Sequence, residues 1–245
     1  MKFWTFTNKS SDEGIEEAEL RIEGDIVSDD DSWLYELFGM PATSPNMFKA
    51  ELAKFKGKPL IVWIDSFGGD VFAAAGIYNA LKEHDATITV KIDGKAMSAA
   101  SVIAMAGDSV LMSPVAMMMI HNPLTFAVGD MHDLRHVADV LDSVKESIVN
   151  AYQLKTKHTR AEIAEMMDNE TWMSAKAAMK DGFADGMLYA EENAQNLAQN
   201  MQFNRLAFQN GVDETKRKLI ELCRKREQPE LERLRAELAL QIEIL

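Results

Sequence analysis

Short apolar runs alternate with amphipathic stretches along the first 190 residues of the chain. Residues 20–27, 59–65 and 87–93 are rich in β-branched side chains and predict strands. The apolar stretch at 71–84 lies between the last two of these strands and has the length of a crossover helix. This alternation is typical of an α/β fold with a largely parallel sheet.

The pattern continues with a helix of small residues predicted at 98–107 and an apolar strand at 115–121. Because parallel strands are covered on both faces, we expect the run at 115–120 to be buried on both sides. Residues 131–156 then predict a long amphipathic helix, which packs on the core or on a second subunit. Its apolar face holds Leu134, Val137, Leu141, Val144, Ile148 and Tyr152.

Two segments depart from this alternation. Residues 30–55 lie between the first two strands, where Pro41 and Pro45 mark a loop between helical pieces, and we interpret the segment as an insertion. The last part of the chain is rich in Asn and Gln at first, and then in charges and leucines at helical spacing. We therefore divide the chain into a domain at 1–190 and a charged helical tail at 191–245, which is a surface helix or a partner-binding helix.

The amino-acid composition limits the classes of binding partner that we expect. The chain holds 39 acidic and 26 basic side chains, a net charge of −13, which repels phosphate backbones and argues against nucleic acid as a partner. No uncharged apolar run reaches the roughly 18 residues that span a bilayer, so we expect no membrane role. With Cys223 as the single cysteine, no internal disulfide can form, and we expect a cytoplasmic location.

Three motifs at strand ends can carry chemistry. Gly68 and Gly69 follow a strand and open a helix, where backbone N–H groups can bind an oxyanion, although such a pair is also an ordinary turn. Ser98 follows the next strand among small residues and is a nucleophile or a helix cap, with Ser101 as a competitor one helical turn later. His121 ends an apolar strand and is a general base or a structural histidine.

Taken in order, these motifs and the segment ETWMSA at 170–175 resemble the Clp-type serine peptidases over about residues 16–190. The similarity is greatest to the phage head maturation branch. The resemblance implies a superhelical stack of ββα units, the fold that Clp peptidases share with the crotonases. It also implies a ring-shaped homo-oligomer, in which the helix at 131–156 contacts other subunits.

The resemblance further assigns roles to single residues. It implies Ser98 as the nucleophile, His121 as the general base, and the backbone N–H groups of Gly68 or Gly69 and of Ala99 as the oxyanion hole. The third triad member of the family is an aspartate at the position of Glu170. A glutamate can also orient an imidazole, and we favour Glu170 as the third catalytic residue over Asp168, a rival on the same side of an extended strand.

The function that the resemblance implies is that of an ATP-independent serine endopeptidase that cleaves capsid or scaffold proteins during phage head maturation. No cofactor and no metal is expected; His132 and His136 alone, at helical spacing, do not make a metal site. A catalytically silent assembly protein and a crotonase-like acyl-CoA enzyme are the alternatives. A serine–lysine dyad with Lys95 is a weaker variant, because it leaves His121 without a role.

Overall fold

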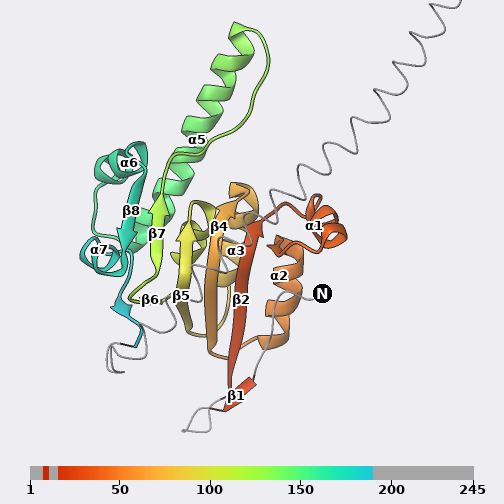
Figure 1. Ribbon diagram of the computed structural model, residues 1–245, viewed down its shortest axis with the longest axis vertical. Helices are drawn as coiled ribbons and strands as arrows, with labels where there is room; N and C mark the ends of the chain where they lie inside the picture. Colours follow the sequence, from red (N-terminus) through yellow and green to blue (C-terminus); the bar gives the residue numbers. More distant parts are fainter. Residues whose placement is uncertain (1–7, 11–15, 190–245) are drawn as a thin grey trace, which may run out of the picture. The chain divides into compact units, whose positions relative to one another are not determined.

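A computed structural model describes residues 8–10 and 16–189 of the chain (Figure 1). These residues form a sheet with a parallel centre and helices packed against it, which confirms the expected α/β class. In chain order the elements are β1 (Asn8–Ser10), β2 (Glu16–Ile26), α1 (Ser32–Phe38), β3 (Ala42–Thr43), α2 (Pro45–Leu52), the 3₁₀ helix η1 (Ala53–Phe55), β4 (Leu60–Gly69), α3 (Val71–Lys82), β5 (Ile88–Met97), α4 (Ala99–Ala104), β6 (Ser109–Met112), β7 (Met117–Ile120), α5 (Met131–Lys155), α6 (Arg160–Asp168), β8 (Thr171–Ser174), α7 (Ala175–Lys180) and β9 (Gly186–Met187).

The centre of the sheet consists of parallel strands joined by helices. β2 pairs with β4, β4 with β5, and the first half of β5 with β6. α3 connects β4 to β5, as the crossover pattern predicted, and α4 connects β5 to β6. Residues 95–97 of β5 then pair with residues 117–119 of β7 instead of with β6. The split brings the ends of β5 and β7 side by side.

The two faces of the central strands differ in burial. Side chains such as Ile22 and Val62 point into the core and are fully buried. On the other face Arg21, Trp63 and Lys91 stand in register across β2, β4 and β5 and are partly exposed. The cationic groups of Arg21 and Lys91 lie 5.7 and 5.1 Å from the centre of the Trp63 ring. The sheet therefore has one buried face and one partly exposed, charged face.

β7 differs from the strand expected at 115–120. It pairs in parallel with β5 along one edge and antiparallel with β8 along the other. Met118 and Ile120 are fully buried, whereas Met117 and Met119 are partly exposed. The prediction that this run is covered on both faces is therefore wrong. An antiparallel partner allows one face of the strand to be open, and the run of methionines conceals the alternation.

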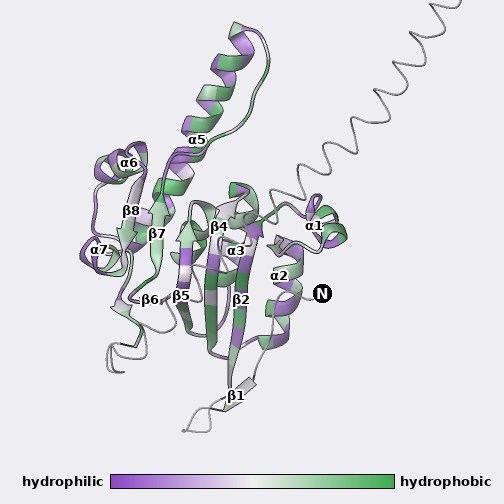
Figure 2. Cartoon of the chain, viewed as in Figure 1, coloured by the Kyte–Doolittle hydropathy of each residue, from purple (hydrophilic) through white to green (hydrophobic). Residues whose placement is uncertain are grey.

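α5 confirms the long helix predicted at 131–156, but only its C-terminal part packs on the core. Ile148, Val149 and Tyr152 are buried, whereas Leu134 is 48% exposed. The N-terminal part extends away from the sheet in Figure 1, and Figure 2 shows hydrophobic residues along its length. The periodicity predicted packing on the core or on a second subunit, and the structure shows packing on the core for the C-terminal end of the helix.

The expected insertion at 30–55 contains α1, β3, α2 and η1, with Pro45 in the first turn of α2. α2 places Phe48 and Leu52 in the hydrophobic core, so this helix is an integral part of the fold. α1 has no buried residue. The segment that stands outside the core is therefore shorter than the sequence pattern predicted.

The tail at 191–245 lies outside the described residues, so its helix and the boundary at residue 190 stay predictions. Within residues 8–10 and 16–189, no helix has the length and apolar character that crossing a bilayer requires.

Candidate active site

Ser98 stands at the turn between β5 and α4, with its main chain fixed on both sides. Its N–H donates to the carbonyl of Met119 in β7 at 2.9 Å, and its carbonyl accepts from the N–H of Ser101 at 2.9 Å. Its backbone angles, φ 52° and ψ −126°, are those of the first central residue of a type II′ turn, a position usually held by glycine. A serine here is strained, and such strain concentrates at functional sites.

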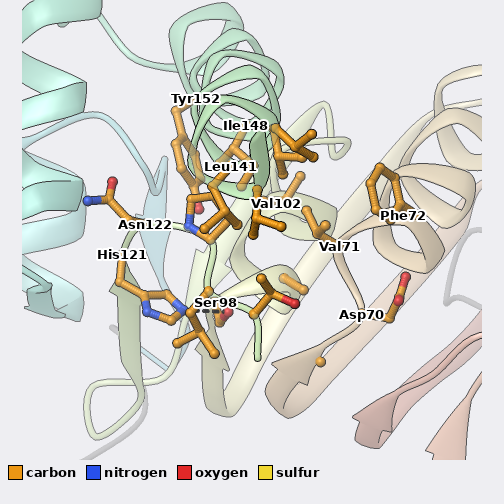
Figure 3. Close-up of a pocket in the computed structure, with 18 residues that line it drawn as sticks. Asp70, Val71, Phe72, Ser98, Val102, His121, Asn122, Leu141, Ile148 and Tyr152 are labelled. Atoms are coloured by element: carbon orange, nitrogen blue, oxygen red, sulfur yellow. Dashed lines mark hydrogen bonds between the residues drawn. The ribbon is translucent and has the colours of Figure 1, made fainter. Parts of the chain in front are cut away.

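His121 follows the last residue of β7 and reaches the same point. Because β7 pairs with the end of β5, residue 97 stands opposite residue 119, and the residues after the two strands are neighbours. His121 Nε2 lies 2.7 Å from Ser98 Oγ (Figure 3), and both residues are partly buried. A neutral imidazole at this distance can accept the hydroxyl proton. The structure thus brings together the nucleophile and the base that the sequence predicts.

The paired glycines at the end of β4 lie against the Ser98 turn. A Cβ atom on Gly68 would lie 2.8 Å from Ser98 Cβ and 2.9 Å from Ala99 N, so no side chain fits there. Gly68 has φ 102° and Gly69 has φ 143°, both in the region that favours glycine. The close approach of these two turns is therefore possible only because position 68 is a glycine.

The backbone N–H groups of Gly68 and Gly69 differ in whether they can donate to an oxyanion. The N–H of Gly68 donates to the hydroxyl of Ser66 at 3.0 Å and is already used. Gly69 and Ala99 both line the cavity that contains Ser98 and His121. Ala99 is the first residue of α4, where an N–H has no acceptor within the helix. This geometry favours Gly69 over Gly68 as the partner of Ala99.

The two carboxylates proposed as third member have different partners. Asp168 Oδ1 accepts from Asn122 Nδ2 at 2.7 Å and from Lys145 Nζ at 2.5 Å. The Lys145 ammonium, together with the Asn122 amide, holds the pKa of Asp168 below its ordinary value. Glu170 Oε1 accepts from the indole N–H of Trp172 at 3.0 Å. Among the described residues, the ring of His121 is hydrogen-bonded to Ser98 alone, so the third position stays a prediction.

Glu170 is nevertheless nearer than Asp168 in sequence to the strand that pairs with β7. β7 and β8 are antiparallel, with Ile120 opposite Thr171. The next pair of residues, His121 and Glu170, lies beyond the strands; Glu170 has φ 46°, so the strand register does not fix the direction of its side chain. Asp168 is the last residue of α6, two positions beyond that pair.

The rival residues have other roles. Ser101 is fully buried; its hydroxyl donates to the Ser98 carbonyl at 2.6 Å and lies 2.8 Å from the Tyr152 hydroxyl. It therefore supports the turn and is closed to substrate. Lys95 forms an ion pair with Asp65, with its Nζ 2.6 Å from Asp65 Oδ1. Neither residue is placed to replace His121 or Ser98.

A cavity of about 550 Å³ opens beside Ser98 and His121 (Figure 3). α3, α4, α5 and the segment after His121 contribute its mostly apolar walls. The labelled lining residues include Val71, Phe72, Val102, Leu141, Ile148 and Tyr152. The sequence predicted the apolar face of α5 but not that this face forms a wall of the cavity. Val71 and Phe72 were not predicted as lining residues. Their one signal in the sequence is their position just after the glycine turn.

A sequence model of the Clp protease family matches residues 47–191, a range that contains every residue of the candidate active site described above. The chain belongs to the Clp protease family. Relatives include the ATP-dependent Clp protease proteolytic subunit 1 of Chlamydia muridarum, which is 32% identical over 139 residues, 55% of this chain and 72% of that protein. The subunit of the same name from Chlamydia trachomatis serovar D is 31% identical over 139 residues, with the same coverage. The ATP-dependent Clp protease proteolytic subunit of Bacteroides thetaiotaomicron is 28% identical over 137 residues, 54% of this chain and 61% of that protein.

Proposed function

We propose that this member of the Clp protease family is a serine endopeptidase. The observation that carries the proposal is the 2.7 Å hydrogen bond between Ser98 Oγ and His121 Nε2 beside an apolar cavity. Family membership supports the same chemistry, because the relatives are named as protease subunits. A core of stacked β-strands and helices holds both side chains at strand ends, where their geometry is fixed by main-chain hydrogen bonds.

The proposed reaction uses these groups in sequence. His121 takes the proton of Ser98 as the hydroxyl attacks the scissile carbonyl carbon. The N–H groups of Gly69 and Ala99 stabilise the oxyanion that develops on the carbonyl oxygen. His121 then gives its proton to the leaving amine, and an acyl-enzyme remains on Ser98. Water, activated by the same histidine, hydrolyses the ester and restores the serine.

Glu170 is proposed as the residue that orients His121 and stabilises its protonated form. Replacing Glu170 with Gln and Asp168 with Asn gives a matched pair, since each change removes one carboxylate and keeps its shape. We expect the larger loss of kcat from Glu170→Gln. A larger loss from Asp168→Asn would assign the third position to Asp168.

The apolar walls of the cavity support a preference for peptides with a large apolar side chain before the cleaved bond. Burial of such a side chain contributes about 2 kcal/mol relative to exposure. The sequence contains no phosphate-binding loop of the GxxxxGK[ST] type. We propose that hydrolysis of unfolded substrates by this chain proceeds without ATP, unlike the activity named for the relatives.

We further propose that the substrates are capsid or scaffold proteins of an assembling phage head, in the host cytoplasm, and that the enzyme works as a homo-oligomeric ring. The support is the order and the residue types of the sequence motifs, which resemble those of the phage branch of the Clp-type peptidases. In particles assembled with the Ser98→Ala variant, capsid or scaffold proteins should keep their full length by mass spectrometry. Normal processing in those particles would reject the maturation role.

One observation favours a second candidate, a silent assembly protein: neither carboxylate is bonded to His121. Labelling with a fluorophosphonate distinguishes a serine peptidase from a silent assembly protein, because only an activated serine reacts. If the chain is a peptidase, intact-mass measurement should detect a single adduct on the wild type and on Ser101→Ala, and no adduct on Ser98→Ala. An unlabelled wild type would support the assembly protein instead.

A further inference from the structure

Trp172 is the one hydrogen-bond donor on the side chain of Glu170 among the described residues. Its indole N–H donates to Glu170 Oε1 at 3.0 Å. Trp172 lies in β8 opposite Met119 of β7, two residues before the proposed general base His121 along the chain, and Glu170 directly precedes β8. Trp172 is 50% exposed, so burial alone does not explain a tryptophan here.

The backbone of Glu170 shows that the side chain is kept at a conformational cost. Its φ is 46°, in the left-handed region, directly after the last turn of α6. Helices often end with a glycine in this conformation, which costs a glutamate more. The N–H of Glu170 donates to the carbonyl of Met167 at 3.2 Å, and the hydroxyl of Thr171 donates to the carbonyl of Met166 at 2.6 Å. The base of the side chain is thus fixed.

These contacts hold the side chain at its base and at its tip. A glutamate has one more rotatable bond than the aspartate usual in this position, and therefore more orientations to lose before it can hold an imidazole. The indole N–H occupies Oε1 and leaves Oε2 able to accept from a second donor. We propose that Trp172 is a positioning residue, which holds the carboxylate of Glu170 for His121. This inference rests on the peptidase function proposed above.

The test compares Trp172→Phe with the wild type, because phenylalanine keeps an aromatic ring and removes the N–H donor. Trp33→Phe is the matched control, since Trp33 is 62% exposed in α1, away from the site. We expect Trp172→Phe to lower kcat for peptide hydrolysis by about three- to tenfold with KM unchanged. Trp33→Phe should change neither.

Two readouts distinguish positioning from packing. A carboxylate beside an imidazole favours the protonated ring, so the pH midpoint of fluorophosphonate labelling should fall in Trp172→Phe and in Glu170→Gln. In the Glu170→Gln background, Trp172→Phe should cause no further loss, because the two residues act as one unit. The inference would be wrong if the kcat losses of Trp172→Phe and Glu170→Gln multiplied in the double variant. It would also be wrong if the pH midpoint of labelling did not shift in Trp172→Phe.

The outcomes also separate this inference from the function on which it rests. An unlabelled wild type rejects the peptidase, whereas full activity of Trp172→Phe beside a slow Glu170→Gln rejects the role of Trp172 alone. Should Trp172→Phe be unstable, the indole N–H resonance of ¹⁵N-labelled wild type reports the same bond. It should move strongly in Glu170→Gln, and an unchanged resonance would contradict the proposal.

Discussion

Ser98 shows how much of the site depends on the backbone of one residue. Its φ of 52° would suit a glycine, yet the site needs a hydroxyl at that point. The neighbouring hydrogen bonds to Met119 and Ser101 hold the strained turn in place. A conformation of this kind costs about 1–3 kcal/mol, which the rest of the fold must offset. The strain fixes the direction of Oγ before any substrate binds.

This strain leads to a prediction about stability rather than activity. Ser98→Gly and Ser98→Ala both remove the nucleophile, so both should be inactive. Glycine relieves the strained φ, whereas alanine retains it, so Ser98→Gly should be more stable by about 1 kcal/mol. For a domain of this size the difference is about 2–4 °C in Tm, which thermal unfolding of the two variants resolves. Equal Tm values would show that the turn is unstrained.

At the scale of elements, the sequence predicted the strands and helices that position the site. β4, β5, α3 and α4 lie where apolar runs and small residues placed them, so Ser98 and His121 were predictable as strand-end residues. The split of β5 between β6 and β7 was not predictable, because it depends on the pairing of strands distant in sequence. The bond between Trp172 and Glu170 was missed for a similar reason: side-chain hydrogen bonds at a helix end leave no periodic signal.

The contact between α4 and α5 also lay beyond sequence patterns, and it has a pH dependence. Tyr152 of α5 is fully buried, and burial raises its pKa. Because the Ser101 hydroxyl donates to the Ser98 carbonyl, the Tyr152 hydroxyl must donate to Ser101 Oγ. The bond therefore requires a protonated tyrosine. It joins α5 to the turn that carries the nucleophile.

Tyr152→Phe tests this contact. At pH 7 the variant should lose about 1 kcal/mol of unfolding free energy, because the hydroxyl of Ser101 loses its donor. In the wild type, the stability contributed by the neutral tyrosine is complete below the unfolded pKa of about 10 and declines as the pH rises above it. The difference between wild type and Tyr152→Phe should narrow from pH 9 to pH 11 in urea titrations. A constant difference would show that Tyr152 does not titrate differently in the folded state.

At the scale of the whole molecule, exposed apolar side chains cluster on α1 and, more fully exposed, in the segment that leads into α5. Phe126 is 93% and Val128 is 87% exposed in the segment before α5, and Met131 and Leu134 are 55% and 48% exposed at its start. Isolated exposed apolar residues are common, but a run of them marks an interaction surface. The periodicity of α5 and the ring proposed for this chain both point to a second copy as the partner, since closed homo-oligomers bury such surfaces symmetrically.

Charged or polar substitutions on the surface before and at the start of α5 should weaken the oligomer. The wild type should be an oligomer by light scattering, and Phe126→Ser combined with Leu134→Glu should reduce its mass, because a charge buried in a subunit interface is unpaired. Leu37→Glu is the control, since Leu37 is 68% exposed on α1, at a distance in sequence from the surface tested. The fold should survive both changes, because neither Phe126 nor Leu134 belongs to the core. If Leu37→Glu dissociates the oligomer and the double variant does not, α1 rather than α5 joins the subunits, and the amphipathic face of α5 serves the cavity alone.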